Sequence, residues 1–396
     1  MIEITDKHLC CGCGACAALC PKGCLSMKSD EEGFFYPQVD NDGCINCGVC
    51  LNVCPVRNPV KEKKIAQKGY LVQHRDESIR LQSSSGGAFS AIASYVLKRN
   101  GVVFGAAYDE TFQVIHKYVE TVEELAEFRN SKYVQSFSGE CMKQVKAFLE
   151  MGRWVCFSGT PCQIEGLAKY LGKPYERLIL VDVVCHGVGS PLIWRKYLEY
   201  QKTKERKIDQ IRFRDKYYGY KYSTMSFFSG GRNLYHAGAQ MDPMLRAFFS
   251  NICDRPSCYY CPYKKRYRMS DITIWDCFSV YDFDHKMDDD KGTSRVLCHS
   301  EKGCRIMEDI GFMAVCKEIE PERLVKGVKE MFECIRQNPN RNQFFMDAVD
   351  MTGAELFEKY FPVTFLIRMK TAVRGLLVTI GLYGFIKKLL NKMRGR

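Results

Sequence analysis

Several features that would direct a chain to export, into a bilayer or onto nucleic acid are missing from this sequence. The first residues, Met1 to Asp6, have neither the basic nor the apolar region of a secretory signal peptide. The uncharged stretch from Gly375 to Ile386 is too short to cross a membrane as a helix. There is no nucleic-acid-binding module and no basic face interleaved with aromatic residues, so we expect no nucleic-acid partner.

Acidic residues are missing from the end of the chain. Nine of the positive charges behind the net charge of +12 lie between Lys359 and Arg396, a segment without Asp or Glu. The basic character belongs to a predicted helical tail, residues 346–396, and not to the body. Such a segment either lies peripherally on the inner membrane face or docks as a helix on its own body or on a partner, and both alternatives remain open.

Cysteine, in contrast, is abundant. The 396 residues include 22 Cys. Many thiols without a signal peptide indicate a reducing cytoplasm and metal ligation. We therefore expect a cytoplasmic metalloprotein.

Eight of these cysteines form a repeated motif near the N-terminus. The pattern Cys-x-x-Cys-x-x-Cys-x-x-x-Cys-Pro occurs twice and is the run found in bacterial two-cluster ferredoxins, in which the fourth Cys ligates the other cluster. Two [4Fe–4S] clusters are therefore predicted within residues 1–58, an α+β ferredoxin-like domain. The expected ligand sets are Cys10, Cys13, Cys16 and Cys54 for one cluster, and Cys20, Cys44, Cys47 and Cys50 for the other.

Two other uses of these cysteines fit the motif less well. Zinc favours two separated Cys-x-x-Cys pairs, and a disulfide framework needs an oxidising compartment. Neither alternative explains the repeat. Cys11 and Cys24 fall outside the spacing and are interpreted as buried thiols.

The pattern changes after a polar exit at residues 58–64. Apolar strands and helices alternate from Gly69 onward, which is typical of an α/β domain, predicted over residues 59–345. The strands expected at 210–214, 222–228 and 234–237 are consecutive, so they are expected to add an antiparallel section and make the sheet mixed.

Strand-to-helix turns of this domain carry candidate binding residues. The Ser85-Gly86-Gly87 turn could bind a phosphate at a helix N-terminus. The Thr160-Pro161-Cys162 and Cys185-His186-Gly187 turns follow two predicted strands at their carboxyl ends, where α/β sheets place ligands. Lys132, in a polar loop, could place a positive charge near a phosphate or a flavin.

A third metal site is predicted from cysteines distant in sequence. Cys258 and Cys261 form a Cys-x-x-Cys in a loop, and with Cys162 and Cys185 they make a set of four. A third cluster, zinc and a redox-active dithiol are the alternatives for this set. Cys253 or Cys277 could replace a member of it. The remaining cysteines are interpreted as core thiols within helices or strands: Cys141, Cys156, Cys298, Cys304, Cys316 and Cys334.

Taken in order, these motifs resemble the coenzyme F-420 hydrogenase/dehydrogenase beta-subunit family. The resemblance covers about residues 1 to 310. It rests on Ser85-Gly86-Gly87, Ser131-Lys132-Tyr133-Val134-Gln135-Ser136, Gly159-Thr160-Pro161-Cys162-Gln163, Cys185-His186-Gly187, Arg255-Pro256-Ser257-Cys258 with Cys261, and Ser270-Asp271-Ile272-Thr273-Ile274. It implies an FAD-binding α/β domain beside an iron–sulfur cluster. Relatives reduce the deazaflavin coenzyme or tetrapyrrole substrates, and others occur alongside polysaccharide biosynthesis.

The resemblance also implies which residues surround the flavin. They are Ser85, Gly86, Gly87, Ser131, Lys132, Tyr133, Thr160, Pro161, Gln163, His186 and Gly187. His186 and Lys132 are the candidate proton donors. The chain departs from the family at Trp275, where relatives have Gly, and this bulky residue is expected to reshape a pocket wall and to affect the use of deazaflavin.

Two functions follow as hypotheses. In the first, the chain is an oxidoreductase that passes electrons between [4Fe–4S] clusters and FAD to reduce or oxidise a small organic substrate, in polysaccharide or cofactor metabolism. In the second, it is an electron-transfer subunit of a larger redox complex with no substrate of its own. In both it exchanges electrons with a partner protein, a ferredoxin or a member of a redox complex. A structural or regulatory metal-binding protein is a weaker third hypothesis.

Overall fold

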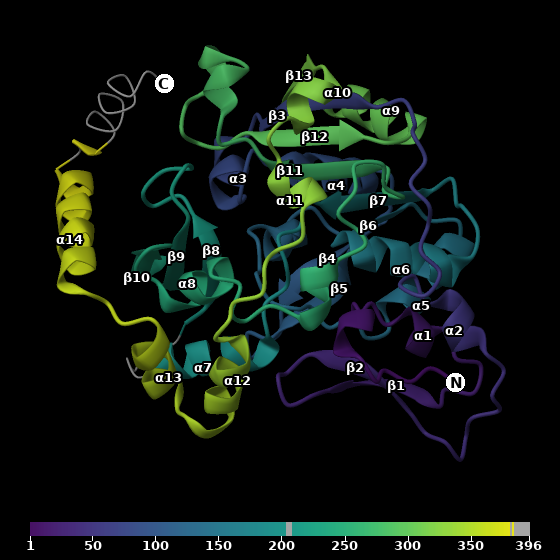
Figure 1. Cartoon of the computed structure of the whole chain (residues 1–396). Coiled ribbons are helices and arrows are strands. Elements are labelled where there is room, and N and C mark those ends of the chain that lie inside the picture. The colour runs from purple at the N-terminus through teal and green to yellow at the C-terminus, as the bar shows by residue number, and fades with distance from the viewer. Residues whose placement is uncertain (203–207, 381, 384–396) are drawn as a thin grey trace.

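The computed structural model describes residues 1–202, 208–380 and 382–383 (Figure 1). The N-terminal part is a small α+β module. Its antiparallel strands β1 (Leu25–Ser29) and β2 (Phe35–Val39) lie beside the short helices α1 (Ala15–Ala18) and α2 (Val49–Val53). Both helices begin after a glycine in the left-handed region, Gly14 at φ 82° and Gly48 at φ 75°, a conformation that other residues rarely adopt.

An eight-stranded mixed sheet forms the centre of the body, as the alternating pattern predicts. Its strand order is β13-β3-β12-β11-β7-β6-β4-β5, with β4, β6, β7 and β11 parallel and the outer strands antiparallel. The strands are β3 (Lys68–His74), β4 (Val102–Tyr108), β5 (Val114–Val119), β6 (Val155–Gly159), β7 (Leu178–Val183), β11 (Ile272–Asp276), β12 (Ser294–Cys298) and β13 (Ala314–Ile319).

Helices cover both faces of this sheet. One face packs against α4 (Ala88–Leu97) and α9 (Glu301–Asp309), and the other against α5 (Cys141–Glu150) and α6 (Pro161–Leu171). Successive strand residues alternate between the two cores, since Val103 belongs to the first and Val102 to the second. Cys13 and Cys16 lie in the second core, so the N-terminal module packs on the α5–α6 side.

The three consecutive middle strands do not join the large sheet, contrary to the sequence expectation. β8 (Gln210–Asp215), β9 (Thr224–Ser229) and β10 (Arg232–Gly238) form a separate antiparallel sheet. Their apolar residues pack with α7 (Pro191–Lys202) and α8 (Pro243–Phe249) in a core of their own, around the fully buried Trp194. The large sheet is mixed because of β5, β12, β3 and β13 instead.

The last helices differ in how they contact the body. α10 (Pro321–Val325) and α11 (Lys329–Phe332) lie over β12, whereas α12 (Arg341–Asp350) and α13 (Gly353–Tyr360) pack against α7. The boundary predicted at residue 346 therefore falls inside α12. α14 (Phe365–Thr379) stands at the periphery (Figure 1). Residues 381 and 384–396 of the predicted tail lie outside the described residues.

Within the described ranges, no helix has the length and apolar character needed to cross a membrane.

Candidate cofactor site

The two predicted ferredoxin ligand sets gather around two separate hollows. The first hollow is lined by Cys10, Cys13, Cys16 and Cys54, so the Cys that follows α2 crosses to the other half of the module. The second hollow is lined by Cys20, Cys44, Cys47 and Cys50. This is the crossed arrangement that the repeat predicts, and the binding of clusters there stays a prediction.

Each hollow is also lined by one of the two cysteines that fall outside the ferredoxin motif. Cys11 lines the first hollow, and Cys24 lines the second with its Sγ 3.4 Å from Cys20 Sγ. Both are half-buried. Cys47, in contrast, is exposed, so the second hollow lies at the surface of the molecule.

A larger cavity of about 530 Å³ is lined by residues of both the N-terminal module and the body. The four remaining predicted ligands line it: Cys162, Cys185, Cys258 and Cys261. Cys162 is in the first turn of α6, Cys185 follows β7, and Cys258 lies in the 3-10 helix η3 (Pro256–Tyr260). The fold thus brings together three segments that are far apart in sequence.

The first hollow and the cavity share a wall. Cys11 lines both, and its Sγ is 3.9 Å from the hydroxyl oxygen of Tyr263, another cavity residue. α6 extends from one site to the other, because it begins at the cavity and its Gly166 faces the first hollow. A Cβ on Gly166 would lie 2.8 Å from Cys13 Cβ.

Arg255 holds the module against the body. Its fully buried guanidinium donates to the carbonyl oxygens of Cys10 (2.9 Å) and Phe35 (3.0 Å) and to Gln135 Oε1 (3.1 Å). Since Arg255 belongs to the same loop as Cys258, one side chain links the cavity to the loop that carries the first ligand set. Sequence reasoning used Arg255 only as part of a motif.

Positive charges lie beside the cavity cysteines. Lys264 Nζ donates to the carbonyl oxygens of Cys185 (2.5 Å) and His186 (3.2 Å), and Arg268 donates to the buried Asp182 (3.3 Å). Burial raises the pKa of the Cys185 thiol, and Lys264 and Arg268 partly oppose that shift. Cations at this position stabilise thiolates and the negative charge of a thiolate-ligated cluster.

The donor set fits an iron–sulfur cluster, and zinc stays an alternative because four thiolates also suit that ion. Four thiols spread around one hollow, with cations beside them, fit a larger iron–sulfur group.

Several of the other cysteines lie elsewhere than the sequence predicts. Cys253 and Cys277, the candidate replacements, are fully buried in apolar cores and do not line the cavity. Cys334 was expected in a core, but it is exposed in the segment after α11, and its Sγ lies 3.5 Å from the carbonyl oxygen of Cys261. The prediction was wrong because helix and strand patterns give no signal in a short irregular segment.

His186 and Gly187 also line the cavity. The imidazole Nε2 of His186 is 2.8 Å from Asn251 Oδ1, and burial lowers the pKa of the ring. Gly187 leaves room for the buried Asp254 carboxyl, whose pKa burial raises to about 8. Burial therefore disfavours the protonated form of the His186 ring beside the cysteines.

The predicted flavin residues divide between two places. Thr160 and Gln163 close the first turn of α6 as a capping box, with Gln163 Oε1 2.9 Å from the Thr160 nitrogen. Ser85 and Ser131 instead lie at the turn before α4, where Ser84 Oγ is 2.7 Å from the Ser131 nitrogen. Lys132 and Tyr133 follow Ser131, and the Tyr133 ring stacks on Phe248 of α8 with the ring centres 4.5 Å apart. Pro161, but none of these four, lines the cavity.

The glycines of the Ser85 turn have internal packing roles. A Cβ on Gly86 would lie 2.1 Å from the carbonyl oxygen of Val72, so only glycine fits between β3 and β12. Gly87 has φ 83° and begins α4 without a side-chain cap. The free amide groups of that helix start remain available to an acceptor.

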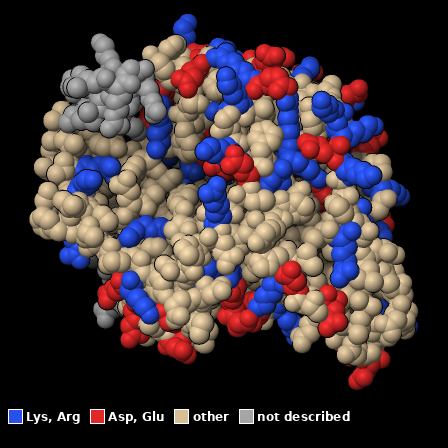
Figure 2. All heavy atoms as spheres, viewed as in Figure 1, with Lys and Arg blue, Asp and Glu red and all other residues tan. Residues whose placement is uncertain are grey.

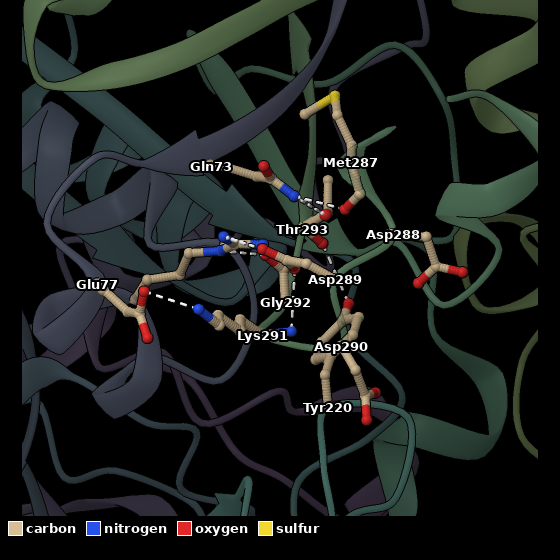
Figure 3. A network of polar contacts seen from close by, with 12 residues as sticks. Gln73, Glu77, Tyr220, Met287, Asp288, Asp289, Asp290, Lys291, Gly292 and Thr293 are labelled. Atoms are coloured by element: carbon tan, nitrogen blue, oxygen red, sulfur yellow. Dashed lines mark hydrogen bonds and ion pairs between the residues drawn. The ribbon is translucent and has the colours of Figure 1, made fainter. Parts of the chain in front are cut away.

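A polar segment, Asp288–Thr293 (Figure 3), contacts this turn, because Ser85 Oγ donates to the Thr293 carbonyl oxygen at 2.7 Å. Arg80 binds it through Asp289 (2.7 and 2.5 Å) and the Gly292 carbonyl (2.7 Å). Lys216 Nζ donates to the carbonyl oxygens of Ser85 and Lys291, both at 2.7 Å. Burial lowers the pKa of Lys216 to about 7. Sequence reasoning missed Lys216, since an isolated lysine in a strand-rich region carries no motif.

Lys132 is enclosed in a similar way. Its Nζ donates to the carbonyl oxygens of Glu127 (3.0 Å), Asn130 (3.3 Å) and Arg129 (3.4 Å). Burial lowers its pKa to about 7. It is therefore a titratable group near neutral pH, as a proton donor would be.

Unpaired donors beside Lys132 fit an acceptor-rich ligand. Arg129 Nε, Asn130 Nδ2 and Arg214 Nη2 are buried without a hydrogen-bond partner. The backbone nitrogen of Arg214 is 2.9 Å from Asn130 Oδ1, so these groups belong to one region. Buried donors are normally satisfied, and the oxygens and ring nitrogens of a dinucleotide such as FAD would satisfy them.

Trp275 does not line the large cavity, and the reshaping of a flavin pocket wall by this residue stays a prediction. It packs from β11 against residues of α10 and α11, including Leu324 and Met331. The next residue, Asp276, pairs with Arg214 at 2.9 Å.

Comparisons with known proteins agree with this arrangement. Residues 152–323 match the family of the C-terminal part of the coenzyme F420 hydrogenase/dehydrogenase beta subunit, and residues 9–58 match a 4Fe-4S dicluster domain. A curated relative, the coenzyme F420-dependent sulfite reductase of Methanocaldococcus jannaschii, is 33% identical over 176 residues, which are 44% of this chain and 27% of the relative. The chain thus spans about a quarter of that protein's length.

A solved structure was also found. A chain of the F420-reducing [NiFe] hydrogenase complex from Methanosarcina barkeri aligns with a TM-score of 0.44 and 15% identity, over 76% of this chain and 92% of that chain.

Proposed function

We propose that this chain, which belongs to the coenzyme F-420 hydrogenase/dehydrogenase beta-subunit family and carries a 4Fe-4S dicluster domain, is an FAD-dependent iron–sulfur oxidoreductase. It passes electrons between three [4Fe–4S] clusters and FAD, and so reduces or oxidises a small organic substrate. The observation that carries the proposal is that the twelve cysteines predicted as ligands line three hollows, with four predicted ligands at each.

The positions of these hollows favour a sequence of electron transfers. The second hollow is at the surface, and the first shares Cys11 with the cavity between module and body. Electrons would enter or leave through the second hollow, by contact with a ferredoxin-type carrier or a member of a redox complex. The first hollow and the cavity would follow in that order.

The flavin belongs, in this proposal, beside the Ser85 turn. Ser85, Ser131 and Lys132, with the unpaired donors of Arg129, Asn130 and Arg214, would hold its acceptor groups. A bound flavin combines single electrons into the pair that a hydride carries. Lys132, with a pKa of about 7, and His186 in the cavity are the residues that could hold or release a proton there.

The substrate and the location are also part of the proposal. The curated relative acts with coenzyme F420, and a deazaflavin is one candidate substrate for this chain too. Substrates of polysaccharide or cofactor metabolism are others. We place the protein in the cytoplasm, peripheral to the inner membrane face.

The match to the sulfite reductase covers only part of that relative, and this partial coverage supports a second function for the chain, electron transfer to a larger complex. Since the match covers 27% of the sulfite reductase, that relative has many further residues with no counterpart in this chain. The chain could therefore act as an electron-transfer subunit without a substrate of its own. Purified protein that reduces only a partner protein, and no small molecule, would favour this function.

Metal and flavin analysis after anaerobic purification tests the proposal. We expect about twelve iron atoms per chain, from three four-iron clusters, together with flavin. The double substitution Cys258→Ser/Cys261→Ser should lower iron to about eight, because only the cavity loses its ligands.

Cys316→Ser is the matched control, since this half-buried cysteine lies in β13, outside all three sets. It should keep the wild-type iron content. Wild-type protein with about eight iron atoms and no flavin would contradict the proposal and reduce the chain to a two-cluster carrier.

A further inference from the structure

Helix α14 exposes an apolar face that the body does not cover. Six of its large apolar side chains are 47–74% exposed. They are Phe365, Leu366, Met369, Val373, Leu376 and Ile380, the last at the helix C-cap. At 3.6 residues per turn these positions fall within an arc of about 100°. We call this arc the apolar face of α14.

The opposite side of the helix fixes its orientation. The guanidinium of Arg374 lies 3.8 Å from the centre of the Tyr222 ring and 5.6 Å from that of Tyr218. Tyr218 is buried, so these contacts attach α14 to the body. The apolar face is consequently turned outward, and in Figure 1 the helix stands at the edge of the molecule.

The charge around this face has one sign. Arg368 and Lys370 are exposed on α14, on either side of the apolar face, and the chain contains no Asp or Glu after Glu358. In Figure 2 the surface over α14 consists of Lys, Arg and residues other than Asp and Glu. The sequence continues beyond α14 with five more basic residues.

We propose that α14 docks the protein on a membrane surface that carries anionic lipids. An apolar arc bordered by Lys and Arg is the pattern of helices that lie in the headgroup region, where apolar burial and attraction to anionic lipid add together. The helix lies flat, since no described helix is long and apolar enough to cross a bilayer. The absence of acidic side chains favours a lipid surface over a second copy, which would bring the same positive charge to the contact.

The loop that holds α14 also contacts the predicted flavin region. Tyr220, in the loop between Tyr218 and Tyr222, accepts a hydrogen bond from the Cys277 nitrogen (2.8 Å) and donates to the Thr293 carbonyl (3.1 Å). Thr293 ends the segment that contacts the Ser85 turn (Figure 3). The docking helix is thus attached to the same loop that contacts this segment, although docking itself does not depend on the proposed redox function.

Vesicle sedimentation with the full chain tests the inference. We expect at least about tenfold stronger binding to phosphatidylcholine vesicles that contain phosphatidylglycerol than to phosphatidylcholine alone. Met369→Glu/Val373→Glu should lower binding to the anionic vesicles at least about tenfold, because both charges enter the apolar face. Met151→Glu is the control, since Met151 is even more exposed but lies on another surface, at the end of α5, and its substitution should leave binding unchanged.

Two results would overturn the inference. One is equal or absent binding of the wild type to both kinds of vesicle. The other is a wild type that ignores vesicles but forms a dimer abolished by Met369→Glu/Val373→Glu, which would make a second copy the partner of the apolar face. Iron and flavin measured on the same samples separate this outcome from a failure of the proposed redox function.

Discussion

Two half-buried lysines distinguish the predicted flavin region at the scale of single residues. Lys132 and Lys216 direct their amino groups at backbone carbonyl oxygens, and burial lowers the pKa of each to about 7. A cation that can lose its proton near pH 7 is suited to a redox site that takes up and releases protons. Lys216 holds the segment of Asp288–Thr293 in place, whereas Lys132 is next to the unpaired donors, so the two roles can be tested separately.

The pH dependence of stability should reveal Lys132. Its pKa is about 7 when folded and 10.5 in the unfolded chain, so the unfolded state binds more protons between these values and wild-type stability rises with pH there. Lys132→Met removes this contribution. The melting temperature of the variant minus that of the wild type should therefore be higher at pH 6.5 than at pH 9.5, by about 2–5 °C.

Lost hydrogen bonds alone would shift the melting temperature of Lys132→Met by the same amount at both pH values. Such a constant offset would contradict a lowered pKa. Lys143→Met, which removes a lysine from an exposed ion pair with Glu140, should show no dependence of this size.

At the scale of elements, α6 connects two of the three cysteine groups. It begins with Thr160 and Cys162 at the cavity and places Gly166 against Cys13 of the first hollow. Glycine inside a helix costs about 1 kcal/mol relative to alanine. The close approach of α6 to the ligand loop is the reason why a side chain does not fit there.

Gly166→Ala should therefore affect the first cluster specifically. The added Cβ would lie 2.8 Å from Cys13 Cβ and displace a ligand, so iron should fall from about twelve to about eight atoms per chain. Gly311→Ala is the control, because nothing lies within 4 Å of a Cβ there. Full iron in Gly166→Ala, with an unchanged spectrum of the reduced clusters, would show that the loop can move aside.

The sequence was sufficient for features with a local signal. The ferredoxin repeat predicts which cysteines share a hollow, because the spacing of the motif determines which thiols can face one another. Apolar runs such as Leu178–Val183 predict buried parallel strands. Contacts between distant segments have no such signal: Lys216 on the Ser85 turn, Arg255 on Cys10 and the separate sheet of β8–β10 depend on packing that one sequence does not reveal.

At the scale of the whole molecule, the three cysteine groups differ in exposure, and this difference indicates where electrons enter or leave the protein. The second hollow includes the exposed Cys47 and is lined by Ile45, which is 58% exposed. The first hollow includes the buried Cys13 and Cys16. A partner protein can reach the exposed Cys47 directly, so we expect protein-borne electrons to enter or leave at the second hollow.

Removing the second cluster should consequently slow reduction by a protein donor but not reduction by a small chemical reductant. Cys44→Ser/Cys47→Ser should keep about eight iron atoms, since the other two sets are intact. Reduction of the remaining centres by dithionite should stay close to wild type, because a small reductant does not need the second hollow. Reduction by a ferredoxin should slow at least about tenfold.

Cys334→Ser, which removes another exposed thiol, should change neither rate. Unchanged reduction by ferredoxin in Cys44→Ser/Cys47→Ser would instead place the entry point at the cavity, and the second cluster would then lie off the route to the flavin.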